Sequence, residues 1–139
     1  MIAFDADVFS EILAGHPQYS QRAHQISVHE QAVPIVVVEE ILRGRLNSIR
    51  QAEAGKSKLS LERAYDLFGV TLNAFRHVTV LPYTSGADIL YQQWRSEKAR
   101  GGTHDLRIAA ICVACSATLI TRNQRDFEQV PGLSLEVWT

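Results

Sequence analysis

Acidic residues follow short apolar runs, or begin a mostly apolar segment, in four separate parts of this sequence. Apolar runs of this length are typical of buried strands, and parallel strands present their carboxyl ends at one edge of a sheet. Carboxylates at such places are expected to converge on one cleft, although they lie far apart along the chain. The residues concerned are Asp5, Glu39, Glu40, Asp105 and Asp126.

A cluster of three or four carboxylates needs a cation, because like charges otherwise repel and raise one another's pKa. Hard divalent ions with oxygen ligands meet this need, and Mg²⁺ and Mn²⁺ are the usual choices. The cluster holds no histidine or cysteine, which argues against zinc. Such an ion generates hydroxide and stabilises charge on a phosphoryl group, so the expected reaction is hydrolysis of a phosphodiester or phosphate ester.

Helix capping is the simpler explanation for any one of these acids. Helix N-termini attract Asp and Glu through the macrodipole and through capping hydrogen bonds. Asp7 fits that role best, since it begins the first predicted helix and can accept a bond from a backbone N–H there. Each acid taken alone therefore has two interpretations, and only the joint pattern favours a metal.

The elements that would position these acids alternate between strands and helices. This alternation is typical of a parallel α/β sheet with right-handed crossovers and flanking helices. The predicted strands are 2–4, 33–38 (a central strand), 78–83, 118–121 and 133–138 (an edge strand). The predicted helices are 7–15, 19–31, 39–54, 59–75, 85–100 and 105–117.

A helical hairpin is predicted over 39–75, because GKSK interrupts two long helical segments there. Its basic residues form either a solvated helix face or contacts for RNA phosphates or an acidic partner. These residues are Arg43, Arg45, Arg50, Lys56, Lys58 and Arg63.

Length and composition fit one domain over residues 1–139 with a substantial core. No apolar run approaches the roughly 20 residues that span a bilayer, and no basic-then-apolar leader precedes the first strand. We therefore expect a cytoplasmic protein with no membrane partner. The formal net charge of -1 argues only weakly against nucleic acid, because an acidic metal site would mask a local basic patch.

Cys112 and Cys115 form a lone C-x-x-C. No second pair completes a zinc site, and the apolar neighbours raise a thiol pKa. They are interpreted as two small buried residues on one helix face, in a reducing compartment. Trp94 and Trp138 are interpreted as core or interface residues.

Four motifs, in this order and spacing, resemble those of the PIN-domain ribonucleases, and within them the VapC-type toxins of toxin–antitoxin pairs. The resemblance covers nearly the whole chain and includes the C-terminal stretch VPGLSLEVW. The motifs are FDADVFS at 4–10, VEEILRG at 38–44, GTHDLRIAA at 102–110 and LITRNQRDF at 119–127.

The resemblance implies a PIN-like parallel sheet and an endoribonuclease that uses Mg²⁺ or Mn²⁺ to activate water. Asp5, Glu40 and Asp105 match the three family carboxylates, which makes them the expected catalytic and metal-binding residues. Asn123 and Asp126 match the polar pair after the fourth strand, and Asp126 is the likelier of the two to join the metal shell.

Two finer assignments concern neighbouring residues. Glu40, not Glu39, has the family spacing to the motif glycine, and adjacent helical residues point about 100° apart. Asn123 and the flanking Arg122 and Arg125 are the expected substrate-binding residues, with a phosphate contact expected from at least one of the two arginines.

The chain departs from the family pattern at three positions. Ala6 and Val37 stand where hydroxyl residues are common, so support of Asp5 and Glu40 is expected to be looser. Asp7 replaces the usual asparagine and is interpreted as mainly a cap beside the ligand Asp5. The resemblance also implies RNA as substrate, a homodimer formed through the hairpin, and a VapB-like antitoxin whose tail occupies a groove there.

Two alternatives remain open from the sequence. A haloacid-dehalogenase-like phosphatase shares the D-x-D pattern, with Asp5 as nucleophile and Asp7 as acid, but Phe9 stands where a small residue is usual. A degenerate PIN module would bind RNA or a protein partner without cutting.

Overall fold

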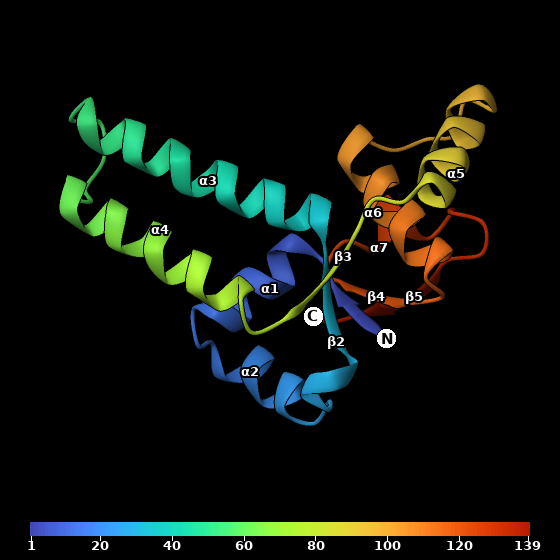
Figure 1. The fold of residues 1–139 in the computed structure, drawn as a ribbon, viewed down its shortest axis with the longest axis horizontal. Helices are drawn as coiled ribbons and strands as arrows, with labels where there is room; N and C mark the ends of the chain where they lie inside the picture. The colour runs from blue at the N-terminus through green and yellow to red at the C-terminus, as the bar shows by residue number, and fades with distance from the viewer.

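The chain forms a five-stranded, fully parallel sheet in the order β3-β2-β1-β4-β5. The computed structural model describes all residues, 1–139. The predicted α/β architecture is confirmed, and β1 is the middle strand (Figure 1). The strands are β1 Ile2–Phe4, β2 Gln31–Pro34, β3 Thr79–Leu81, β4 Thr118–Thr121 and β5 Ser134–Val137.

Helices connect the strands and cover the sheet, and two of them leave it. In Figure 1, α3 and α4 run side by side away from the sheet, which confirms the predicted helical hairpin. The helices are α1 Ala6–Leu13, α2 Pro17–His24, a 3-10 turn Val28–Glu30, α3 Ile35–Glu53, α4 Leu61–Phe75, α5 Ser85–Ser96, α6 Thr103–Ala114 and α7 Gln124–Phe127. None of them is long and apolar enough to cross a bilayer.

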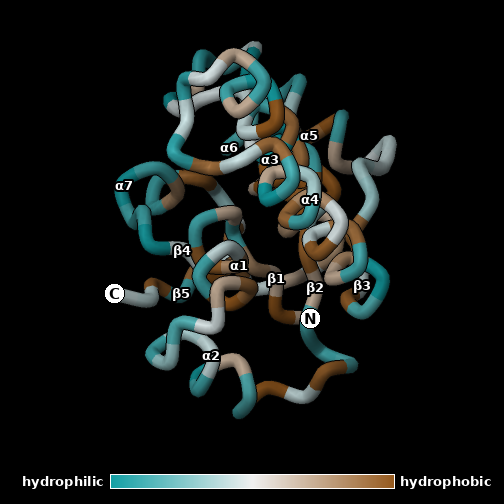
Figure 2. The backbone as a smooth tube through the Cα atoms, turned by 90° about the vertical axis from the view of Figure 1, so that its left-hand side faces the viewer, coloured by the Kyte–Doolittle hydropathy of each residue, from teal (hydrophilic) through white to brown (hydrophobic).

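The core lies between the middle strands and the helices packed on them. In Figure 2 the hydrophobic segments gather at β1, β2 and the helices around them, whereas α2 is mainly hydrophilic. An aromatic chain joins the sheet to the hairpin, since Phe9 stacks on Phe75 at 5.7 Å and on Phe4 at 6.3 Å. Phe4 in turn contacts Trp138. These contacts hold the C-terminal end of α4 against α1.

The predicted strand 33–38 is wrong in its bounds. The strand ends at Pro34, which pairs with Leu81 of β3, and α3 begins at Ile35. Val37 and Ile41, four residues apart, are both buried, while Ile35 is 40% exposed. This is the burial pattern of one helix face, and packing on that face overrides the strand preference of the β-branched run.

Three smaller expectations also need correction. The predicted helix 19–31 is divided, because α2 ends at His24 and only a 3-10 turn follows. Cys112 is fully buried, and burial raises its pKa to about 12, but Cys115 at the end of α6 is exposed, so the two do not share a buried face. The helix predicted to begin at 105 begins two residues earlier, since α6 starts at Thr103.

Candidate active site

Asp5 lies at the point where the middle strand becomes a helix, and its side chain is held from both sides. Its backbone N–H donates to the Ile120 carbonyl, which extends the β1–β4 pairing by one residue. Its Oδ1 accepts the Ala6 N–H at 2.8 Å, and its Oδ2 accepts the Thr121 hydroxyl at 2.7 Å. The residue is only 6% exposed. Asp5 is therefore a buried carboxylate whose orientation is fixed by the fold.

Thr121 is a site residue that the sequence reasoning missed. It ends β4, is fully buried, and donates to Asp5 while accepting the Asn123 backbone N–H at 3.0 Å. Its hydroxyl thus supplies support to Asp5 from the neighbouring strand, although Ala6 supplies none. A threonine at the carboxyl end of an otherwise apolar strand, TLIT, is the signal that could have indicated it.

Glu40 and Asp105 reach the same region from α3 and α6. Burial, and next the negative charge of Asp5, raise the pKa of Glu40 to about 6. Burial and the same charge raise the pKa of Asp105 to about 6, with a further contribution from Asp126. Burial also raises the pKa of Asp5, against the hydrogen bonds from Thr121 and Ala6. The structure therefore gathers carboxylates from β1, α3 and α6 close enough to disfavour one another's ionisation.

Asp7 and Asp126 are the exposed members of this group. The interpretation of Asp7 as the helix cap is wrong: Asp5 is the N-cap of α1, and Asp7 lies in its first turn. The Asp7 Oδ2 instead accepts a long bond, 3.4 Å, from the Asn123 side-chain amide. Asp126 lies in α7 and is close enough to raise the pKa of both Asp5 and Asp105.

A cleft of about 460 Å³ lies beside these acids, between α1 and α3. Asp7 and Glu40 line it from the first two turns of their helices. Ser10, Gly44, Arg45 and Ser48 line it further along the same helices. Its walls are thus mainly polar, with acidic residues at Asp7 and Glu40 and a basic one at Arg45.

A protein-family model described as "PIN domain" matches residues 2–133. This chain belongs to the PIN domain family. The family assignment predicted from the four motifs is confirmed.

Relatives of known name agree with this placement. The chain is 28% identical over 111 residues to Ribonuclease VapC2 of Rickettsia felis, covering 77% of this chain and 73% of that one. It is 38% identical over 63 residues to the tRNA(fMet)-specific endonuclease VapC of Salmonella typhimurium, covering 42% of this chain and 48% of the relative. A solved structure of VapBC2 from Rickettsia felis, bound to a DNA fragment from their promoter, shares the fold with a TM-score of 0.76 and 24% identity, over 100% of both chains.

Two adjacent glutamates of this PIN domain have different surroundings. Glu40 is the one that is electrostatically coupled to Asp5 and Asp105. Glu39 points elsewhere: its carboxylate pairs with Arg43 at 2.6 Å and lies 3.3 Å from the His104 Nε2. His104 lies half-buried in the first turn of α6, and its Nε2 has no hydrogen-bond partner.

The two arginines expected at the substrate differ in their contacts. The Arg122 guanidinium lies 3.6 Å from the Glu11 carboxylate and over the Tyr19 ring, so it faces α1 and α2. Arg125 is exposed in α7 and forms no ion pair. A phosphate contact by either one remains a prediction.

The donor set of this PIN domain fits a hard cation by its chemistry. Its groups are carboxylates, with a hydroxyl on Asp5, and their mutual repulsion would be relieved by positive charge between them. No three His, Cys, Asp or Glu side chains, however, stand in a ready-made ligand arrangement.

Proposed function

We propose that this PIN domain is a VapC-type endoribonuclease that requires Mg²⁺ or Mn²⁺ and cleaves RNA with an activated water. The observation that carries the proposal is the convergence of Asp5, Glu40 and Asp105, each with a raised pKa, beside a polar cleft that Glu40 lines. The names of the curated relatives support the choice of RNA.

The expected roles follow from the surroundings of each residue. Asp5, Glu40 and Asp105, joined by Asp126, would hold the metal. When bound, the ion supplies positive charge to the phosphoryl oxygens and lowers the pKa of a coordinated water. Thr121 fixes the orientation of the Asp5 carboxylate through its hydroxyl. The water oxygen forms the new bond to phosphorus while the 3′-oxygen leaves, so no 2′-hydroxyl takes part and the products carry 5′-phosphate and 3′-hydroxyl ends.

The test is cleavage of RNA by the purified chain with added Mn²⁺ or Mg²⁺, followed by analysis of the product ends. We expect EDTA to abolish cleavage. Products with 2′,3′-cyclic phosphates formed in EDTA would contradict the mechanism. Hydrolysis of small phosphomonoesters with intact RNA would favour the phosphatase, which family membership already disfavours, and RNA binding without cutting would indicate the degenerate module.

We further infer that the chain forms a homodimer and binds a VapB-like antitoxin in the cytoplasm. The support is the fold shared with the toxin of VapBC2 and the apolar side chains that the hairpin exposes. These are Leu46, Leu61, Tyr65, Val70 and Leu72, each between 41% and 62% exposed. An arginine or lysine of the partner placed among the acids would replace the metal's charge and inhibit. Co-expression with the neighbouring small gene product tests this, and a lack of both complex and inhibition would refute it.

A further inference from the structure

One basic residue of the hairpin differs from the others in its surroundings. Arg45 is half-buried, and its Nε donates to the Thr71 hydroxyl at 2.9 Å. Thr71 is 2% exposed, and its hydroxyl donates a hydrogen bond to the Leu67 carbonyl at 2.8 Å. A buried hydroxyl of α4 therefore fixes the orientation of the Arg45 guanidinium, which extends from α3 toward α4.

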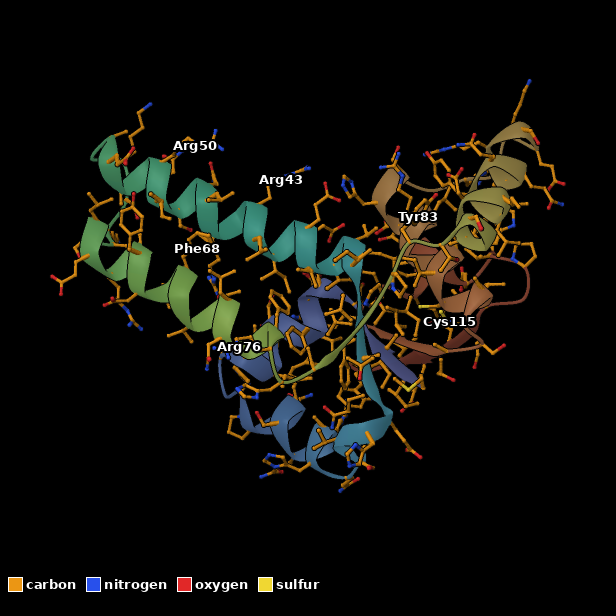
Figure 3. All side chains as sticks on the ribbon, in the orientation of Figure 1. Arg43, Arg50, Phe68, Arg76, Tyr83 and Cys115 are labelled. Carbon is orange, nitrogen blue, oxygen red and sulfur yellow. The ribbon has the colours of Figure 1, made fainter.

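The charge of Arg45 has no acidic partner. No carboxylate lies within ion-pair distance of it, whereas Arg43 pairs with Glu39. Figure 3 shows Arg43 and Arg50 on the outer side of α3, away from α4. A half-buried guanidinium that is oriented but not neutralised has unused N–H donors, which suit a phosphate oxygen.

The place of Arg45 along the helix relates it to the acids. It lines the same cleft as Glu40, five residues further along α3, which is an axial rise of about 7.5 Å at 1.5 Å per residue. Gly44 stands between them on the cleft wall, and a Cβ there would meet no atom within 4 Å, so the path is open. Arg45 also lines a second cleft of about 390 Å³ with Arg63, toward α4.

We propose that Arg45 binds a phosphodiester of the RNA next to the scissile one, and so sets the path of the strand along the α1–α3 cleft. The inference rests on the proposed ribonuclease function and names the positioning residue of its substrate. The neighbouring phosphate lies on Arg45 while the scissile phosphate lies at Asp5, Glu40 and Asp105. Arg45 thus acts on substrate affinity rather than on the chemical step.

The test compares Arg45→Gln, Arg45→Lys and the matched control Arg50→Gln, an exposed residue on the same helix that lines neither of these two clefts. The probe is a single-stranded RNA oligonucleotide that contains a site cut by the wild type in Mn²⁺. A charge-assisted bond of about 1.5–3 kcal/mol corresponds to an effect of about ten- to a hundredfold. We expect Arg45→Gln to raise KM by about this factor with kcat within a few-fold. Arg45→Lys should recover part of the loss, and Arg50→Gln should stay within about twofold.

A second series separates phosphate binding from a purely structural link between α3 and α4. Oligonucleotides with one uncharged methylphosphonate linkage next to the cut should bind the wild type more weakly than unmodified RNA does. The same linkage should not weaken binding to Arg45→Gln any further. Thr71→Val removes the hydroxyl that accepts the Arg45 hydrogen bond but keeps the charge of Arg45. It should lower the unfolding temperature and raise KM less than Arg45→Gln does. The slope of log KM against log salt should fall by about 0.7 in Arg45→Gln.

The outcomes separate the role of Arg45 from the ribonuclease function itself. Normal cleavage by Arg45→Gln with unchanged KM, or an equal penalty from the neutral linkage in wild type and variant, would overturn the assignment of Arg45 alone. If the wild type cuts no RNA in Mn²⁺, the proposed function fails and this inference fails with it.

Discussion

The acid edge, formed by Asp5, Glu40 and Asp105, and the α3–α4 hairpin are stabilised in different ways, although α3 runs through both. At the acid edge, burial raises the pKa of all three carboxyls, neighbouring acids raise it further, and core elements hold the side chains in place. In the hairpin, ordinary helix signals and interhelical packing suffice. The comparison indicates that electrostatic cost is concentrated where the proposed chemistry occurs.

The hairpin is stabilised by local contacts of its own helices, and it exposes apolar side chains. Ser60 caps α4 by accepting the Arg63 N–H at 3.1 Å, and Ala64 and Ile49 are buried between the helices. Apolar side chains nevertheless remain exposed along both helices. A surface of this kind suits association with another protein, whereas the acid edge suits a cation and a phosphate.

The largest expected effect breaks the acid edge without breaking the fold. Asp5→Asn and Asp105→Asn should each lose nearly all RNA cleavage, because each removes a charge from the presumed ion and leaves the shape almost intact. Circular dichroism should show both folded, and Asp105→Asn should unfold at a higher temperature than wild type without metal, since like-charge repulsion falls. Unchanged cleavage in either purified variant would remove that residue from the site.

A second substitution pair sharpens the boundary of the acid edge to one residue. Glu40→Gln should lower the cleavage rate by orders of magnitude and weaken Mn²⁺ binding measured by calorimetry. Glu39→Gln, the matched control, should change either quantity only a few-fold, because Glu39 is engaged with Arg43 and His104. The opposite result would mean that the second motif is displaced by one position.

Much of the fold followed from sequence because its signals are local. The strands 2–4 and 118–121 have the predicted bounds, and the hairpin is where the GKSK break places it. The boundary after Pro34 did not follow, because a short β-branched run fits a strand and a buried helix face equally well. The Thr121–Asp5 bond joins residues 116 positions apart and depends on β4 lying beside β1. Sequence spacing cannot show the pairing of β1 with β4, nor the hydrogen bond from Arg45 to Thr71.

The hairpin can be weakened without touching the acid edge. Ser60→Ala removes the α4 cap and should cost about 1 kcal/mol of unfolding free energy in a urea titration. Cleavage of RNA by the folded variant should keep the wild-type kcat, since Ser60 lies at the start of α4 and does not line the cleft beside Glu40. A large loss of kcat would show that the two regions are coupled.

A further expected effect is a dependence of stability on pH that comes from the acid edge. In the folded chain without metal, the pKa of Glu40 and that of Asp105 are both about 6, above their ordinary values of 4.5 and 3.8. Between about pH 4 and pH 6 the folded state therefore binds more protons than the unfolded state, so stability falls as pH rises through this window. Urea unfolding in EDTA should show this decline, and Glu40→Gln should reduce its slope whereas Ser60→Ala should leave the slope unchanged. Added Mn²⁺ should oppose the decline, because a bound cation favours the ionised carboxylates. A stability that rises over this range in EDTA would mean that the acids do not repel one another as their positions indicate.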